Sequence, residues 1–237
     1  MIKNKTIVVI GGSSGIGLAS AKLLAGKGAQ IIIGGRTPEK IEKALRFIGM
    51  AATGHAIDMT QDESVANFFS KTEKIDHLVI TAAGAELGNF LELDIKKAQS
   101  FFESKFWGPY RIVKYSAPLL AQDGSVTFFS GAASRRASPG FACGSAINAA
   151  VETLAQTLAL ELAPIRVNTI SPGIVNTPVW DSITQDKQKL FSEMESKLPG
   201  KRVGEPSDIA HAVKFVIENQ FITGTTLFVD GGYLLTN

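Results

Sequence analysis

The strongest constraint on the fold is a buried strand followed at once by a glycine-rich turn and a helix. Residues 6–10 are apolar and mostly β-branched, which is typical of a parallel strand covered on both faces. The turn carries Gly11, Gly15 and Gly17, and the helical pattern after it stops at residues 26–28. Glycines let backbone N–H groups approach a pyrophosphate, and a helix N-terminus attracts the same negative charge. This segment therefore predicts a dinucleotide site at one end of a parallel sheet.

Short apolar runs alternate with helical patterns along the rest of the chain. The alternation predicts right-handed crossovers and a Rossmann-type α/β fold, a doubly wound parallel sheet of about seven strands with helices on both faces. Strands are expected near residues 6–10, 30–34, 53–57, 77–81, 125–130, 166–171 and 226–229. Two long helices are expected at about 95–120 and 140–163. The second is apolar on more than one side, which predicts a homodimer or homotetramer.

Composition limits the remaining classes of protein. The 237 residues, 45% of them apolar, suffice for one core, and no linker divides them, so residues 1–237 are expected to form one domain. A single Cys excludes an internal disulfide, and no signal peptide or run of about 20 apolar residues is seen, so we expect a cytoplasmic protein with no membrane partner. A net charge of +2 gives no indication of nucleic acid binding. The three histidines lie on separate segments, so no metal site is expected.

Several motifs resemble the short-chain dehydrogenase/reductase family over almost the whole chain. The spacing of Gly11, Gly15 and Gly17 is similar to that of the family and differs from the Gly-x-Gly-x-x-Gly of most dinucleotide folds. Residues 75–84 resemble the family's fourth strand and its Asn-Asn-Ala-Gly turn, although Thr81 and Ala82 replace both asparagines. The segments 166–173 and 222–232 are further close matches. The resemblance implies a nicotinamide cofactor and a small-molecule substrate, whose identity the sequence does not give.

The turn and the resemblance together assign the positions that bind the cofactor. They are Gly11, Ser13, Ser14, Gly15, Ile16, Gly17, Arg36, Asp58, Met59, Ala82, Ala83, Gly84, Asn148, Pro172, Gly173, Ile174 and Thr177. By the resemblance, Asp58 is expected to meet the adenine. The second strand ends without an acid and is followed by Arg36, which favours a 2′-phosphate through charge-assisted contacts. NADP(H) is therefore the expected cofactor; alternatively, Arg36 only begins the loop before the next helix.

Most of the catalytic residues of the family are absent. In the family a Tyr acts as general acid with the help of a Lys, while a Ser orients the carbonyl and an Asn holds a water relay. Here Gly144 stands at the Tyr position, Asn148 at the Lys position and Lys105 at the Asn position. Ser130 is expected at the Ser position, although a match without gaps would place Gly131 there. The chain is thus interpreted as a divergent member that lacks the Tyr-x-x-x-Lys dyad.

Ser130 and Lys105 remain as the candidate catalytic residues. Lys105 has three interpretations: a replacement proton donor whose pKa falls on burial near a positive nicotinamide, an anchor for an anionic substrate, or a solvated helix charge. Tyr110 and Lys114 reproduce the spacing Tyr-x-x-x-Lys, but they lie on the preceding helix, and we interpret the match as a coincidence. Residues 176–199 correspond to the substrate lid of the family.

Two functions of different class follow from these observations. The first is an NADPH-dependent oxidoreductase with a non-standard active site and low activity on ordinary family substrates, acting on a carbonyl or enoyl compound. The second is a non-catalytic NADP(H)-binding or sensor protein, which kept the cofactor turn and lost the acid.

Overall fold

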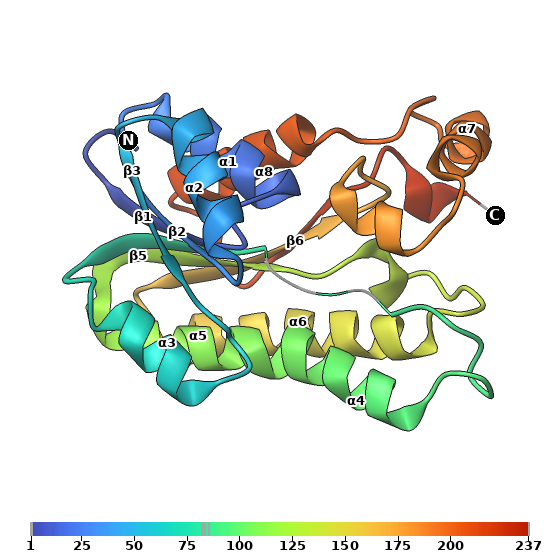
Figure 1. Ribbon diagram of the computed structural model, residues 1–237, viewed down its shortest axis with the longest axis horizontal. Coiled ribbons are helices and arrows are strands. Elements are labelled where there is room, and N and C mark those ends of the chain that lie inside the picture. Colours follow the sequence, from blue (N-terminus) through green and yellow to red (C-terminus); the bar gives the residue numbers. More distant parts are fainter. Residues whose placement is uncertain (1, 82–83, 85, 237) are drawn as a thin grey trace.

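The computed structural model describes residues 2–81, 84 and 86–236, and over these residues seven parallel strands form one sheet (Figure 1). The strand order is β3-β2-β1-β4-β5-β6-β7. The strands are β1 (Thr6–Ile10), β2 (Gln30–Gly35), β3 (Ala52–Ala56), β4 (Ile75–Ile80), β5 (Leu120–Phe129), β6 (Arg166–Pro172) and β7 (Thr226–Val229). The predicted doubly wound sheet is confirmed, and β5 begins five residues before the predicted strand 125–130.

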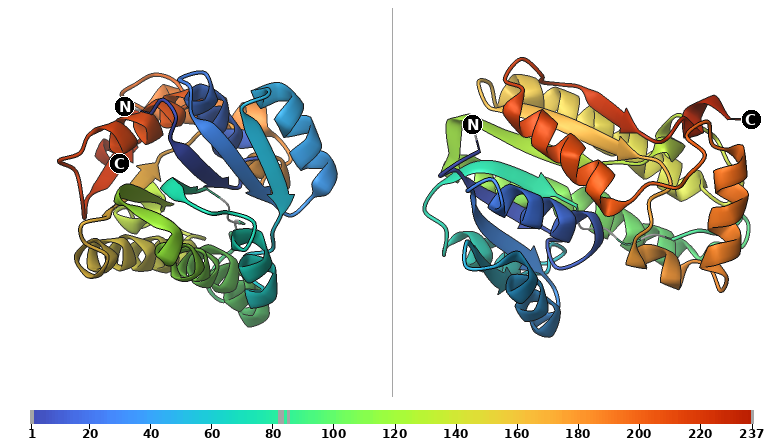
Figure 2. Two further views of the ribbon diagram at one scale, coloured as in Figure 1. Left: turned by 90° about the vertical axis from the view of Figure 1, so that its left-hand side faces the viewer. Right: turned by 90° about the horizontal axis from the view of Figure 1, so that it is seen from above.

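Helices cover both faces of the sheet, as Figure 2 shows in two further views. The α-helices are α1 (Gly15–Ala25), α2 (Pro38–Ile48), α3 (Asp62–Phe69), α4 (Ile95–Phe102), α5 (Gly108–Ser116), α6 (Ala142–Glu161), α7 (Lys187–Lys197) and α8 (Pro206–Glu218). Short 3₁₀ helices lie at Ala117–Leu119, Ala132–Ser134, Pro178–Ser182 and Tyr233–Leu235. No helix in the described ranges is long and apolar enough to cross a membrane.

Two apolar cores hold the layers together. Helices α1, α2 and α8 pack on one face, where Leu24 and Val213 meet strand residues such as Ile31. Helices α3 to α6 pack on the other face, where Phe68 and Ile147 are fully buried. The central strands are therefore buried on both sides, which explains why their sequences are continuous apolar runs instead of alternating patterns.

The long helix predicted at 95–120 is interrupted. Helix α4 ends at Phe102, a π-helical turn follows at Glu103–Trp107, and α5 begins at Gly108. Such a turn holds an extra residue relative to α-helix, and π-turns recur at functional sites. The prediction of one regular helix was therefore wrong, and the irregular turn contains Lys105.

The strand order reverses direction between β1 and β4. The connections from β1 lead to β2 and β3 on one side, and those from β4 lead to β5, β6 and β7 on the other. In open parallel sheets the crevice outside the carboxyl ends of the strands at such a point is where ligands bind. The topology thus directs the search for a site to the ends of β1, β4 and β5.

Candidate functional site

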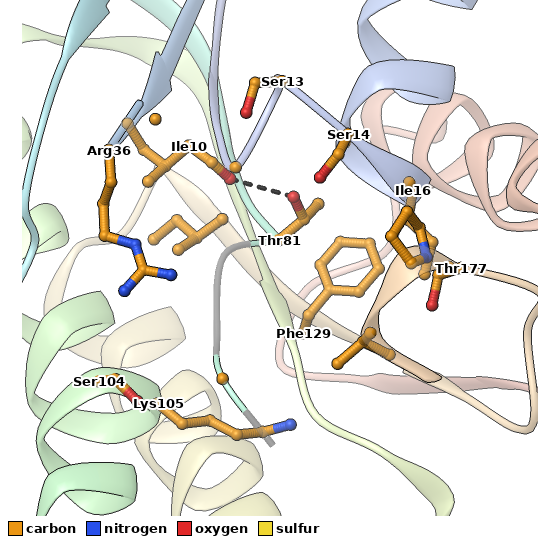
Figure 3. Close-up of a pocket in the computed structure, with 18 of the residues that line it drawn as sticks. Ile10, Ser13, Ser14, Ile16, Arg36, Thr81, Ser104, Lys105, Phe129 and Thr177 are labelled. Carbon is orange, nitrogen blue, oxygen red and sulfur yellow. Dashed lines mark hydrogen bonds between the residues drawn. The ribbon is translucent and has the colours of Figure 1, made fainter. Parts of the chain in front are cut away.

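A cavity of about 420 Å³ lies at the carboxyl ends of the strands. Residues from the β1–α1 turn, the ends of β2, β4, β5 and β6, the π-turn and the segment after β6 line it. Figure 3 shows Arg36 and Lys105 reaching into it from different elements, with Ser14 and Thr177 on another side. The cavity therefore brings together the glycine-rich turn and Arg36 with Lys105 and Ser130.

The β1–α1 turn is shaped by close backbone contacts. Gly11 has φ of 86°, in the left-handed region that favours glycine. A Cβ on Gly17 would overlap the Gly11 carbonyl oxygen and lie 2.5 Å from Thr81 Oγ1. Thr81 Oγ1 in turn donates to the Ile10 carbonyl (3.1 Å; Figure 3), which ties the turn to β4. The N-terminus of α1 therefore opens directly to the cavity, as a pyrophosphate requires.

Ser14 adds a hydroxyl to this turn. It is the N-cap residue of α1, yet its side chain makes no capping hydrogen bond. An N-cap serine usually accepts from a backbone N–H of the first turn. Its hydroxyl instead lines the cavity, where an anion would provide a partner. The residues present thus fit the phosphates of a dinucleotide.

The far end of the cavity is basic. Arg36 lines it, and so do Thr37 and Lys40 at the start of α2. Asp58 accepts hydrogen bonds from the backbone N–H (3.0 Å) and hydroxyl (2.8 Å) of Thr60. The backbone hydrogen bond, the hydroxyl and the charge of Arg36 lower the pKa of Asp58. An ionised Asp58 carboxylate can hold an adenine amino group, while the cations of the same cavity can face a phosphate.

Lys105 enters the cavity from the π-turn. Its side chain is half-buried and lines the cavity, and Nζ lies 5.9 Å from the centre of the Phe101 ring. Burial lowers the pKa of Lys105 to about 8, and among the described residues no carboxylate offsets this effect. The pKa of Lys105 is thus lowered toward physiological pH, although the ammonium form still predominates at pH 7, and the side chain lines the cavity.

Ser130 follows β5 and also lines the cavity. Its Oγ donates a hydrogen bond of 2.9 Å to Glu152 Oε1. Glu152 lies on α6, is only 2% exposed, and also accepts from Ser134 Oγ (2.6 Å) and pairs with Arg135 (3.3 Å). The sequence reasoning missed Glu152. Its spacing of four residues from Asn148 and eight from Gly144 places all three on one face of α6 and is the signal that could have found it.

The positions of the missing dyad lie behind this surface. Gly144 and Asn148 are buried, and among the described residues neither lines the cavity. A Cβ on Gly144 would meet the Phe101 ring at 3.6 Å. The Oδ1 atom of Asn148 has no hydrogen-bond partner among the described residues, and a Cβ on Gly131 would lie 3.0 Å from its Nδ2. Asn148, which the sequence assigned to the cofactor, is therefore not among the described residues that line the cavity.

Most of the predicted cofactor residues meet in the cavity. Those that line it are Gly11, Ser13, Ser14, Gly15, Ile16, Gly17, Arg36, Asp58, Met59, Gly84, Pro172, Gly173 and Thr177. Ile174 is absent from this lining, where its neighbour Val175 stands instead. Ala82 and Ala83 lie outside the described residues. Lining residues that sequence reasoning did not assign include Lys40, Thr60, Ser104 and Phe129.

The segment after β6 covers part of the cavity. Trp180 lines it, and its Nε1 donates to the Val175 carbonyl (2.8 Å). The Trp180 ring packs edge-on against Phe191 of α7, with 6.1 Å between ring centres. By contrast, Tyr110 and Lys114 are exposed on α5 and do not line the cavity. Their spacing is consistent with a coincidence.

These features define a class of protein, and comparison with known proteins shows the family. The family model of enoyl-(acyl carrier protein) reductases matches residues 10–234. A short-chain dehydrogenase/reductase of Stachybotrys chlorohalonatus, ATR9, is 30% identical, with 99% of this chain and 98% of that protein covered. The chain belongs to the short-chain dehydrogenase/reductase family, whose members bind a nicotinamide cofactor.

Two further relatives are similar over nearly their whole length. An uncharacterized oxidoreductase of Thermotoga maritima is 32% identical, with 98% of this chain and 96% of that protein covered. The crystal structure of a small-chain dehydrogenase in complex with NADPH is 35% identical, with a TM-score of 0.83 and coverage of 98% and 100%. The relatives' names support an oxidoreductase.

Proposed function

We propose that this protein is an NADP(H)-dependent oxidoreductase that lacks the family's Tyr and Lys and in which Lys105 and Ser130 face the substrate. The observation that carries the proposal is the position of Lys105. Its ammonium lines the cavity and is half-buried without a carboxylate partner among the described residues. An uncompensated buried charge is costly, so a lysine held there indicates a role in the site.

The choice of NADP(H) over NAD(H) is supported by the basic end of the cavity. Arg36 and Lys40 would hold the 2′-phosphate, Asp58 the adenine, and the β1–α1 turn with Ser14 the pyrophosphate. A similar protein of known structure binds NADPH. When bound, NADPH supplies a hydride to the substrate.

Lys105 then acts through Nζ, first as a hydrogen-bond donor and then as a proton donor. Because the pKa is about 8, Lys105 is protonated in most molecules at pH 7, so Nζ donates a hydrogen bond to a substrate oxygen. As negative charge grows on that oxygen, the lowered pKa favours release of the proton to it. Trp180 lines the cavity and packs against Phe191 of α7. The segment 176–199 is proposed as a substrate lid, as the sequence predicts.

The test is Lys105→Met, which removes the ammonium and keeps an unbranched side chain. Purified protein is screened for NADPH oxidation with aldehydes, ketones and enones, and a compound that reacts is used for both variants. We expect kcat/KM to fall by about 10²–10⁴ while NADPH affinity changes less than about threefold. The matched control is Lys114→Met, because Lys114 is an exposed residue of α5.

The pH dependence gives a second readout of the same proposal. Because the protonated form of Lys105 is the active one, the rate should fall as pH rises through about 8. Lys105→Arg keeps its charge at all these pH values and should remove this fall. An unchanged rate in Lys105→Met would contradict the role of this residue.

The second candidate is a non-catalytic NADP(H)-binding protein. The glycine at position 144 and the asparagine at 148 favour it, since neither can act as the family's acid. Tight NADPH binding with no turnover of any compound in the screen would support this candidate.

A further inference from the structure

We propose that Glu152 is a positioning residue that fixes the direction of the Ser130 hydroxyl, so that the site recognises an alcohol. Ser130 would face the cavity as a hydrogen-bond acceptor, and Lys105 would be the donor beside it. The inference rests on the proposed function, because it places a substrate oxygen between these two groups.

The hydrogen bonds around Glu152 determine where the Ser130 proton points. A serine hydroxyl has one proton and two lone pairs, whereas an ionised carboxylate only accepts. Glu152 Oε1 accepts from Ser130 Oγ (2.9 Å) and Ser134 Oγ (2.6 Å), and Arg135 faces Oε2 at 3.3 Å. The single proton of Ser130 is thus directed into the protein. What Ser130 presents to the cavity is a pair of lone pairs.

The environment of Glu152 keeps this arrangement fixed. Glu152 is 2% exposed and Ser130 is 6% exposed, so water does not compete for either partner. Arg135 Nη2 lies 3.3 Å from Glu152 Oε2, so a cation faces the carboxylate oxygen that neither serine contacts. An apolar side chain would fill this place on α6 at lower desolvation cost, and it would leave Ser130 free to rotate.

The consequence concerns which oxygen fits beside Ser130. A carbonyl oxygen carries only lone pairs and would face the lone pairs of Ser130. An alcohol hydroxyl can donate to Ser130 Oγ and accept from Lys105 Nζ at the same time. Both residues line the same cavity, and the substrate hydroxyl is proposed to lie between them. The usual task of the family's serine, which is to orient a carbonyl, is therefore inverted in this chain.

Two inert probes test the inference with the protein bound to NADP⁺. The tertiary alcohol 1-methylcyclohexanol cannot be oxidised, and 2-methylcyclohexanone cannot be reduced by NADP⁺. Affinities for the NADP⁺ complex are measured by ligand-observed NMR titration. We expect the alcohol to bind about tenfold more tightly than the ketone, since one hydrogen bond distinguishes them.

Glu152→Gln should abolish the preference with little change in shape. Arg135 requires an acceptor, so the amide oxygen would face Arg135 and the amide N–H groups would face Ser130 and Ser134. Ser130 would then accept from Gln and direct its own proton into the cavity. The ratio of alcohol to ketone affinity should fall about tenfold.

Two further variants separate positioning from a structural role. Ser134→Ala removes the other hydroxyl on the same carboxylate oxygen and should keep the ratio. In a Ser130→Ala background the substitution Glu152→Gln should no longer change the ratio. A change that persists without Ser130, or that is equal for both probes, would overturn the inference.

The outcomes also separate this inference from the proposed function. If the unmodified protein does not bind NADP⁺, both the proposed function and this inference are overturned. Normal NADP⁺ binding with no alcohol preference, or with no binding of either probe, would overturn only the role of Glu152 and Ser130. If Glu152→Gln does not fold, neutron diffraction of the unmodified protein decides the matter: the Ser130 deuterium should lie toward Glu152 Oε1, and a deuterium directed into the cavity would refute the inference.

Discussion

At one end of the cavity the β1–α1 turn is formed mainly by backbone groups, whereas at the other end Lys105, Ser130 and Glu152 act through side chains from three separate elements. The first arrangement depends on glycines that allow close approach, such as Gly17. The second depends on the identity of a few side chains. One fold can therefore keep a nucleotide site unchanged while its reacting end is rebuilt by a few substitutions.

The comparison predicts its largest effect at Gly17. In Gly17→Ala the new Cβ would overlap the Gly11 carbonyl, so the turn must move. Its N–H groups would then no longer point at the pyrophosphate. We expect NADPH affinity, measured by calorimetry, to fall by at least about 100-fold. Gly26→Ala at the end of α1 is the control, because Gly26 has φ of −63° and its Cβ would make only ordinary contacts. Equal affinity in Gly17→Ala would show that the turn does not hold the cofactor.

Restoring the Tyr and Lys at positions 144 and 148 tests whether the site can still reduce a ketone by the family's mechanism. Gly144 does not line the cavity, so the Tyr side chain must extend past Phe101 to reach it. If it does, the double variant Gly144→Tyr/Asn148→Lys should raise NADPH-dependent ketone reduction about 10- to 100-fold. Each single change should do little, because the Lys acts through the Tyr. The control is Gly144→Tyr with Ala149→Lys, which places the charge on the exposed side of α6. A rise in the control as large as in the double variant would contradict the dyad explanation.

Arg36→Ala sharpens the description of the nucleotide end. Loss of one charge-assisted contact should lower the preference for NADPH over NADH about tenfold, measured by parallel titrations. Lys40 should retain part of the preference, since it lines the same region. The control is Arg46→Ala, because Arg46 is an exposed residue of α2. Equal affinities for NADPH and NADH in the unmodified protein would refute the specificity.

The smallest effect on the site is expected from the outer face of α6. Leu160 is 81% exposed there, and a homo-oligomer is proposed that covers it. Leu160→Glu should lower the oligomer mass measured by light scattering and change NADPH affinity less than about twofold. Phe221→Glu, at a second exposed apolar residue, should leave the mass unchanged. A monomeric parent protein at high micromolar concentration would exclude the oligomer.

The sheet and the nucleotide turn could be predicted because their signals are local. A β-branched run such as residues 6–10 and the three glycines that follow are adjacent in sequence, and their geometry follows from backbone sterics. Lys40 escaped prediction although it lies four residues after Arg36. Its role depends on how α2 turns toward the cavity, which the sequence does not state.

The reacting end was harder to predict because its contacts are distant in sequence. Ser130 and Glu152 are 22 residues apart, and Glu152 reads as an ordinary helix acid until its burial is known. The π-turn at Glu103–Trp107 has no sequence signature comparable to that of Gly or Pro. The direction of Lys105 therefore could not be settled from the residues alone.

The π-turn makes the direction of Lys105 a question of register. Successive residues of an α-helix are rotated by about 100°, so deleting one residue from Glu103–Trp107 would restore α-geometry and turn α4 by that angle relative to α5. The same lysine would then sit on another face of the helix with no change in its chemistry. In this chain the length of a single helical turn decides whether a positive charge reaches the reacting end of the cavity.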